Sequence, residues 1–425
     1  MIRIFEKNEI SPAEVLRRDN AATGVADAVR AILADVRENG DQALRRYCEK
    51  FDGGAPERLE VSRAEIDAAY GRVEKDFIAV LEEAAANIRD FHARQKRQSF
   101  IVSEQPGRVL GQRFIPLRRV GLYVPGGTAC YPSTVLMNCI PAVLAGVEEV
   151  CICTPAKNGK LSDDILAAAK IAGAHRVFRA GGAQAVAALA YGTETIPRVD
   201  KITGPGNVFV AEAKRQVFGL VDIDMIAGPS EILVVADGHT DPVWCAADLL
   251  SQAEHDKNAA AVLVTPSRNL AEAVQRELER QLAALPRQEI ARASVESRGK
   301  IILVDSVDEA IDLANAIAPE HLELCLDEPF DWLGRVRSAG SVFLGRHCPE
   351  ALGDYLAGPN HTLPTGGTAR FSSPLSVDDF VKKSQFIYYT DKALQSVGRQ
   401  VIAFAEREGL SGHGRSVAVR LEGDK

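Results

Sequence analysis

Short apolar runs alternate with amphipathic helical segments over most of this chain, which is the pattern of a parallel α/β sheet. Two series of such runs follow one another, and the first is interrupted by alanine-rich segments such as ILAAAKIA and AQAVAALAYG. The predicted strands, in chain order, are Val120–Val124, Val150–Thr154, Arg176–Phe178, Val199–Thr203, Val221–Met225, Glu231–Asp237, Ala260–Thr265, Lys300–Asp305, His321–Leu326 and Gly340–Gly345. Two similar α/β units predict a bilobal protein with a cleft, although the likeness is architectural and no sequence repeat is evident.

Helices of the second series have clear start signals. Asp241 is an N-cap followed by Pro242 at the first helical position, and Ser306 with Glu309 has the spacing of a capping box. Residues 26–97 are predicted to be mostly helical with charged faces. From about residue 376 we expect one more helix, LQSVGRQVIAFAEREG, followed by a turn at SGHG.

The composition describes a soluble globular protein and excludes several classes of partner. A length of 425 residues predicts two to four domains, and 46% hydrophobic residues suffice for a buried core. A net charge of −8 argues against nucleic acid or an anionic membrane surface. The eight cysteines are scattered without a CxxC motif, which favours buried free thiols. With no apolar core of signal-peptide length at the N-terminus, we expect a cytoplasmic protein.

Four of the eight histidines lie in short, polar, turn-rich segments that lack cysteine: SQAEHD, PEHLEL, GPNHTLPTGG and SGHG. Histidine with Asp, Glu and Gln suits a catalytic zinc or a similar divalent ion better than a structural thiolate site. Histidine also supplies acid–base groups that titrate near neutrality. We therefore predict that the chemistry takes place where His255, His321, His361 and His413 converge.

Two of these segments allow more than one interpretation. Gln252 and His255 are three residues apart at the end of a predicted helix, so they are either one edge of a metal site or a solvated helix end. The spacing alone favours the solvated end. Glu320 and His321 lie at the N-terminal end of a predicted buried strand, where they are either an acid–base pair or part of a surface turn.

A long polar loop is predicted from Gly353 to Gly367, and it contains Asp354 and His361. A loop of this length in a compact chain is usually functional or disordered, and its particular residue types favour a function.

Three glycine turns each separate a predicted strand from a predicted helix in the first series: Pro125–Gly127, Gly181–Gly182 and Gly204–Asn207. Backbone amides at such turns can hold phosphate. The last turn lacks the third glycine of the dinucleotide fingerprint, and tight strand-to-helix turns need glycine in any case. The three together favour a nucleotide-sized ligand in this lobe.

Longer segments resemble the histidinol dehydrogenase family, collinearly from about residue 117 to the SGHG segment. They read VGLYVPGG, GGAQAVAALAYGTE, KITGPGN, EAKRQVFG, DMIAGPSEILVVAD, DLLSQAEHD, APEHLEL and DYLAGPNHTLPTGGTARFSS. The resemblance implies an α/β fold with two incomplete Rossmann-like domains, a helical N-terminal region and a small C-terminal extension. It also implies a homodimer with shared active sites. The implied reaction oxidises L-histidinol to L-histidine through L-histidinal with two NAD, the last step of histidine biosynthesis.

The resemblance also assigns roles to individual residues, all of which match the family. It implies one zinc ion per subunit, with ligands at Gln252, His255, Asp354 and His413. Glu320 and His321 correspond to the acid–base pair. The residues that correspond to substrate contacts are Ser230, His361 and Glu408, together with Gln252, His255, His321, Asp354 and His413. Those that correspond to NAD contacts are Tyr123, Gln184 and Asn207.

From these assignments we predict four parts of the chain. They are an N-terminal extension (1–20), a first α/β domain with the zinc and acid–base residues (21–122 plus 231–375), an NAD-binding α/β domain (123–230), and a C-terminal extension that contributes to the partner subunit's site (376–425).

In the implied mechanism, neutral His321 takes the hydroxyl proton as hydride leaves, and Glu320 activates the water that hydrates the aldehyde. Zinc would orient the imidazole and amino nitrogens of the substrate.

One rival is a related zinc- and NAD-dependent dehydrogenase for another small alcohol, but Glu408 and His361 suit a cationic amino-imidazole. A second rival is a two-lobed, non-catalytic metabolite-binding protein. That class would have a signal peptide and lack the Glu320–His321 pair.

Overall fold

The computed structural model describes residues 1–16, 24–126 and 130–422, which form two compact units. The larger unit comprises Met1–Gln95 and Leu117–Phe380. The smaller unit comprises Lys96–Pro116 and the described chain from Val381 onward.

One core of the larger unit is built around a six-stranded sheet that is parallel throughout. Its strands are β1 (Arg3–Glu6), β9 (Glu231–Ala236), β10 (Ala260–Thr265), β11 (Lys300–Leu303), β12 (His321–Cys325) and β13 (Ser341–Leu344). They lie in the order β1-β11-β10-β9-β12-β13. The accompanying helices are α1 (Pro12–Val15), α9 (Pro242–Ala253), α10 (Arg268–Leu282), α11 (Gln288–Ser297), α12 (Val307–Ile317), α13 (Pro329–Leu333) and α14 (Glu350–Tyr355).

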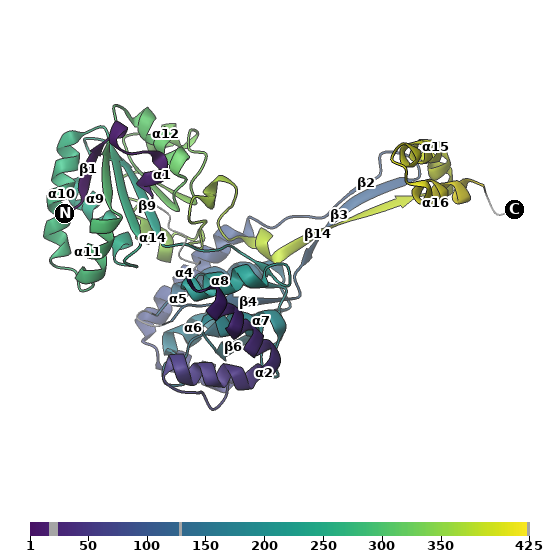
Figure 1. Ribbon diagram of the computed structural model, residues 1–425, viewed down its shortest axis with the longest axis horizontal. Helices are drawn as coiled ribbons and strands as arrows, with labels where there is room; N and C mark the ends of the chain where they lie inside the picture. The colour runs from purple at the N-terminus through teal and green to yellow at the C-terminus, as the bar shows by residue number, and fades with distance from the viewer. Residues whose placement is uncertain (17–23, 127–129, 423–425) are drawn as a thin grey trace. The chain divides into compact units, whose positions relative to one another are not determined.

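Helices cover both faces of this sheet. Successive side chains of a strand point to opposite faces, so neighbouring residues pack against different helices. Ile232 and Val234 pack with α9, α10 and α11, whereas Leu233 and Val235 pack with α1 and α12. Figure 1 shows these two helical layers on either side of the strands.

Helix starts in this part largely follow the sequence signals. Asp241 caps α9 as predicted, and its side chain accepts from the Val243 N–H. The Ser306 side chain caps α12. The capping box is only half formed, since Glu309 accepts from the Asp305 N–H and pairs with Lys7.

A second parallel sheet, of five strands, forms the other core of the larger unit, in the order β6-β5-β4-β7-β8. Its strands are β4 (Arg119–Tyr123), β5 (Glu149–Thr154), β6 (Arg176–Arg179), β7 (Lys201–Thr203) and β8 (Asp222–Ile223). Its helices are α2 (Ala26–Asp52), α3 (Arg63–Arg72), α4 (Lys75–Ala93), α5 (Pro132–Ala145), α6 (Asp163–Ala172), α7 (Gly182–Tyr191) and α8 (Val208–Val217).

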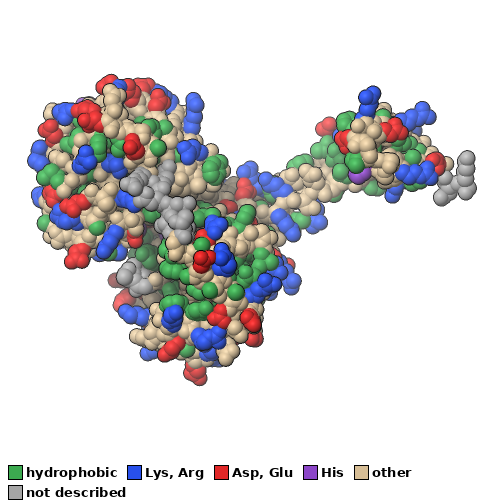
Figure 2. All heavy atoms as spheres, in the orientation of Figure 1, with side chains coloured by type: hydrophobic (Ala, Val, Ile, Leu, Met, Phe, Trp, Pro, Cys, Tyr) green, Lys and Arg blue, Asp and Glu red, His purple; other side chains and the backbone are tan. Residues whose placement is uncertain are grey.

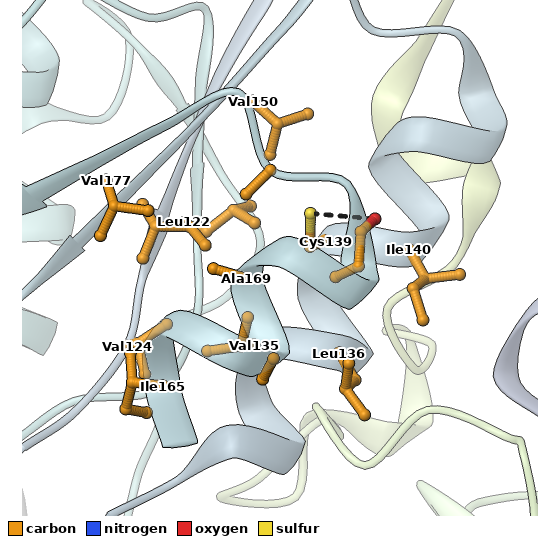
Figure 3. Packing of buried hydrophobic residues seen from close by; sticks show 14 of the residues in the cluster. Leu122, Val124, Val135, Leu136, Cys139, Ile140, Val150, Ile165, Ala169 and Val177 are labelled. Atoms are coloured by element: carbon orange, nitrogen blue, oxygen red, sulfur yellow. Dashed lines mark hydrogen bonds between the residues drawn. The ribbon is translucent and has the colours of Figure 1, made fainter. Parts of the chain in front are cut away.

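This second sheet is also covered on both faces. Leu122 and Val150 lie against Val135 of α5 and Ile165 of α6 in one apolar cluster (Figure 3). The opposite face packs on α2, α7 and α8. The predicted α/β class with two parallel sheets is therefore confirmed.

The packing differs from the predicted domain boundaries at three places. The helices α2, α3 and α4 pack with the helices that cover the five-stranded sheet, not with the six-stranded sheet that holds 231–375. The predicted boundary after residue 122 falls inside β4, which lies in the middle of that sheet. Strand β1, predicted as part of an extension, pairs with β11. An apolar helix stripe indicates burial, but it does not indicate which sheet the helix covers. The boundary after residue 20 lies outside the described residues.

The smaller unit contains an antiparallel sheet that the sequence pattern did not predict. Its strands are β2 (Phe100–Val102), β3 (Arg108–Pro116) and β14 (Val381–Tyr389), and its helices are α15 (Asp391–Arg407) and α16 (Ser411–Leu421). Strands β3 and β14 pair along their whole length, from Val381 opposite Pro116 to Tyr389 opposite Arg108. The predicted turn at SGHG is instead the first turn of α16. The smaller unit thus combines residues 96–116 with the C-terminal segment.

Acidic and basic side chains are interspersed over the two sheet-and-helix parts on the face shown in Figure 2. Among the described residues, no helix has the length and apolar character that a bilayer span requires.

Candidate active site

The backbone of one residue, Glu231, holds both members of the Glu320–His321 pair. The Glu231 N–H donates to Glu320 Oε2 at 2.9 Å, and His321 Nδ1 donates to the Glu231 carbonyl oxygen at 3.0 Å. Strand β12 brings them there, because it pairs with β9 so that His321 lies opposite Ile232. Both side chains are buried. The alternative of a surface turn is therefore wrong.

These contacts define the protonation of His321. A carbonyl oxygen only accepts, so Nδ1 carries the hydrogen and the Nε2 lone pair of the neutral ring is available. Nε2 is buried and has no hydrogen-bond partner among the described residues. Burial lowers the pKa of His321 to about 4, so the ring is a neutral base at pH 7. Burial, reinforced by neighbouring carboxylates, raises the pKa of Glu320 well above its usual range.

A second group of side chains lies at the ends of α9 and α14. The ligand atoms of His255, Glu350 and Asp354 all lie within 4.8 Å of one another. Glu350 and Asp354 are four residues apart and share one face of α14. Gln252, one turn before His255, is 1% exposed, and its amide oxygen and nitrogen have no hydrogen-bond partner among the described residues. A buried, unpaired amide is costly, which disfavours the alternative of a simple solvated helix end.

The electrostatics of this group suit a divalent cation. Burial raises the pKa of Glu350 to about 8, with the Asp354 carboxylate adding to the shift. Burial also raises the pKa of Asp354 to about 6. A bound cation would favour the charged form of both. The donors are imidazole nitrogen and carboxylate or amide oxygen without thiolate, so these residues fit a catalytic zinc or a similar ion.

Glu350 is a residue that sequence reasoning missed. Its Oε1 lies 3.7 Å from His321 Nε2, so it connects the acid–base pair with the cation-binding group. Ser251 donates to Glu350 Oε2 at 3.1 Å, and the Glu350 N–H donates to buried Glu323 at 2.8 Å. The available signal was the i, i+4 spacing of Glu350 and Asp354 after Pro349, at the start of the predicted loop that begins with Gly353.

His361 approaches the same group from the segment after α14. Its Nδ1 donates to the Asp354 carbonyl oxygen at 3.1 Å, and the Thr134 hydroxyl donates to its Nε2 at 3.4 Å. Burial lowers its pKa to about 4. Nearby, Asn360 donates to the Met137 carbonyl oxygen at 2.6 Å. The segment is therefore tied to α5 by hydrogen bonds, and the alternative of a disordered loop is wrong.

A second histidine–carboxylate cluster is a poorer cation site. Asp237, His239 and Asp327 also bring their ligand atoms within 4.8 Å of one another. However, Arg346 donates to Asp237 at 2.6 Å and to Asp327 at 2.7 Å. The guanidinium already supplies the positive charge that a metal ion would bring.

The three residues predicted to contact NAD lie at the carboxyl ends of strands in the five-stranded sheet. The Tyr123 hydroxyl, at the end of β4, accepts from the Gly182 N–H at 3.1 Å. Gln184 is buried in the first turn of α7. Asn207 caps α8 by accepting from the N–H groups of its first turn. Ligands of open α/β sheets typically bind at this edge. Gly127, in the first predicted turn, lies outside the described residues.

The remaining predicted residues are placed as follows. Ser230 directly precedes β9, and its carbonyl oxygen accepts from the Ala260 N–H at 3.0 Å. Glu408 caps the C-terminus of α15, and His413 lies in the first turn of α16. Both are exposed residues of the smaller unit. Their role in a partner subunit's site stays a prediction.

The chain has close relatives along its whole length. Residues 15–421 match the family model described as histidinol dehydrogenase. The histidinol dehydrogenase of Syntrophotalea carbinolica is 55% identical over 412 residues, which is 96% of each chain. That of Halalkalibacterium halodurans is 54% identical over 400 residues, 94% of each. The crystal structure of histidinol dehydrogenase from Elizabethkingia anophelis superposes with a TM-score of 0.94 at 39% identity, covering 99% of this chain and 98% of the other.

The pKa of His321 predicts how a His321→Asn substitution changes the pH dependence of stability. The unfolded imidazole takes up a proton near pH 6.5 and the folded one near pH 4. As the pH falls between these values, only the unfolded state gains this proton, so the wild type loses stability relative to the variant. We expect a relative loss of roughly 2 kcal/mol at about pH 5 compared with about pH 7.5.

Urea denaturation of the metal-free proteins at both pH values measures this difference. His347→Asn, at an exposed position, controls for the substitution itself. A wild-type-to-variant difference that stays constant with pH would mean that His321 is protonated as readily in the folded state as in the unfolded state.

Proposed function

The chain belongs to the histidinol dehydrogenase family, and from this premise we propose that it oxidises L-histidinol to L-histidine through L-histidinal. Two molecules of NAD would each accept one hydride, in the last step of histidine biosynthesis. The observation that carries the proposal is the buried Glu320–His321 pair, held on the Glu231 backbone beside a group of nitrogen and oxygen ligands.

His321 is proposed to take the proton from the substrate oxygen in both oxidations. Hydride leaves a carbinol carbon only as the hydroxyl proton is removed. The unpaired Nε2 of a neutral ring has the lone pair for this task, and the Nδ1–H bond to Glu231 keeps the ring in the required tautomer.

Glu320 is proposed to activate the water that converts the aldehyde to its hydrate. The second oxidation needs this step, because only the hydrate carries a hydroxyl proton and a further hydride on the same carbon. As a carboxylate, Glu320 would remove a proton from the attacking water. Burial raises its pKa, so nearby positive charge would favour the form that acts as a base.

The proposed zinc ligands are Gln252, His255 and Asp354, with His413 of the partner subunit. Zinc would orient the substrate through its imidazole and amino nitrogens. Support comes from the buried, unpaired amide of Gln252 and from the cluster of His255 with two carboxylates. Ser230, His361 and the partner subunit's Glu408 are proposed to contact the substrate. Tyr123, Gln184 and Asn207 are proposed to contact NAD.

A homodimer with shared sites is part of the proposal. It is supported by large apolar side chains that are exposed on α15 and α16, among them Phe404 at 73%. Exposed apolar surface of this kind is typical of an association interface. A cytoplasmic location is supported by the eight cysteines, all of them unpaired thiols.

The first test concerns the metal and the stoichiometry. We expect two NADH per L-histidinol, abolished by chelation and restored by Zn²⁺. His255→Asn should fold but lose bound zinc and activity, because one ligand is removed. His239→Asn, in the cluster that Arg346 occupies, is the matched control and should keep both. One NADH per substrate, or a full zinc complement in an active His255→Asn protein, would refute this proposal.

The second test separates the two oxidations. His321→Asn should slow both, since each needs a proton taken from oxygen. Glu320→Gln should slow the second far more than the first, by about 10²–10⁴-fold, because only the second needs the hydrate. Single-turnover NADH formation from histidinol and from histidinal measures the two halves. Equal slowing of both halves by Glu320→Gln would rule out the proposed division of roles.

The third test concerns the shared site. His413→Asn and His321→Asn proteins should each be inactive alone. If one subunit completes the site of the other, mixed dimers contain one site free of both substitutions and should regain part of the activity. Mass spectrometry establishes that mixed dimers have formed. Mixed dimers that form and stay inactive would contradict a shared site.

A further inference from the structure

A buried ion pair holds the first residue of the turn between β7 and α8. Lys214 Nζ donates to the Gly204 carbonyl oxygen at 3.0 Å, and the Gly204 N–H donates to Asp224 Oδ2 at 2.7 Å. Lys214 and Asp224 are also paired with each other, and their side chains are only 2% and 1% exposed. Two opposite buried charges therefore bind both polar backbone groups of one residue.

The turn has little room for another conformation. Gly204 has φ +109°, and a Cβ at this position would lie 2.0 Å from the Tyr123 carbonyl oxygen. Lys214 lies two helical turns beyond Asn207 and folds back toward the start of α8, whereas Asp224 directly follows β8. The ion pair thus ties together the second half of α8, the glycine turn and the residue that follows the edge strand β8.

A buried ion pair contributes little net stability to the fold, so its main effect here is on the position of the backbone groups that it binds. Removing two charges from water costs free energy that their attraction offsets only with good geometry, and an apolar pair of similar size is often as stable. Here the charges meet backbone groups that an apolar pair could not bind. Their specific effect is on the conformation of residues 204–207.

We propose that Lys214 and Asp224 are positioning residues for NAD. They hold the Gly204–Asn207 turn in the conformation that lets Asn207 and the turn meet the cofactor. This inference rests on the proposed function, in which Asn207 and Tyr123 contact NAD.

The test compares Lys214→Met with Lys201→Met in the full-length protein. Lys201 is a matched control, because it is also buried, pairs with Asp222 at 3.1 Å and lies at the opposite end of β7. We expect Lys214→Met to weaken NAD binding by about 10-fold or more, with little change in the KM for histidinol. Lys201→Met should lower the melting temperature but leave the NAD dissociation constant unchanged. Isothermal titration calorimetry with NAD alone measures the affinity.

Asp224→Asn is the second variant. It keeps one oxygen for the Gly204 N–H and removes the charge, so its loss of NAD affinity should be smaller than that of Lys214→Met. If Lys214→Met does not fold, Asp224→Asn is compared with Lys201→Met by the same criterion. If the wild type oxidises histidinol, and both Lys214→Met and Asp224→Asn bind NAD as tightly as Lys201→Met does, the positioning role is wrong and the proposed function stands. A wild type without histidinol oxidation would instead refute the proposed function.

Discussion

The arrangement of Glu320 and His321 depends on the pairing of two central strands. Glu231 offers one N–H and one carbonyl group, and these bind Glu320 and His321 respectively. Both hydrogen bonds depend on the register of β12 against β9, because a shift of one residue would move Glu320 and His321 away from the Glu231 backbone. Strand β13 must also approach closely, since a Cβ at Gly340 would lie 2.5 Å from the Glu320 carbonyl oxygen. The sheet itself is thus the scaffold of the candidate chemistry.

Much of the fold could be predicted from the sequence because parallel strands buried on both faces are continuous apolar runs. The ten predicted strands of the two parallel sheets all exist, with ends that differ by a few residues. Strand β1 was missed because RIFE is short and polar at both ends. Strands β3 and β14 were missed because their side chains are mostly exposed or half-buried and show no clear alternation. The assignment of α2, α3 and α4 to the part with the five-stranded sheet depends on long-range packing, which hydrophobic periodicity cannot predict.

The candidate site was predictable to the extent that it consists of histidines in polar segments. Spacing alone favoured a solvated helix end for Gln252 and His255, whereas the family resemblance implied metal ligands. The buried, unpaired amide of Gln252 disfavours the solvated helix end. Glu350 was missed because it lies in a six-residue helix that begins just before the predicted loop. The role of Glu231 could not be predicted, because it is exerted by backbone atoms that every residue possesses. Lys214 and Asp224 meet only after a helix and a strand have been placed.

The residue before Pro319 has a consequence for the rigidity with which Glu320 and His321 are held. Ala318 ends α12 with φ +53°, a left-handed conformation in which helices usually use glycine. An alanine in this region costs about 1–2 kcal/mol. However, alanine followed by proline allows the link between α12 and β12 far fewer alternative backbone conformations than glycine would. The carboxyl group and the imidazole are therefore preorganised by a stiff link, and substrate binding need not supply the entropy of ordering it.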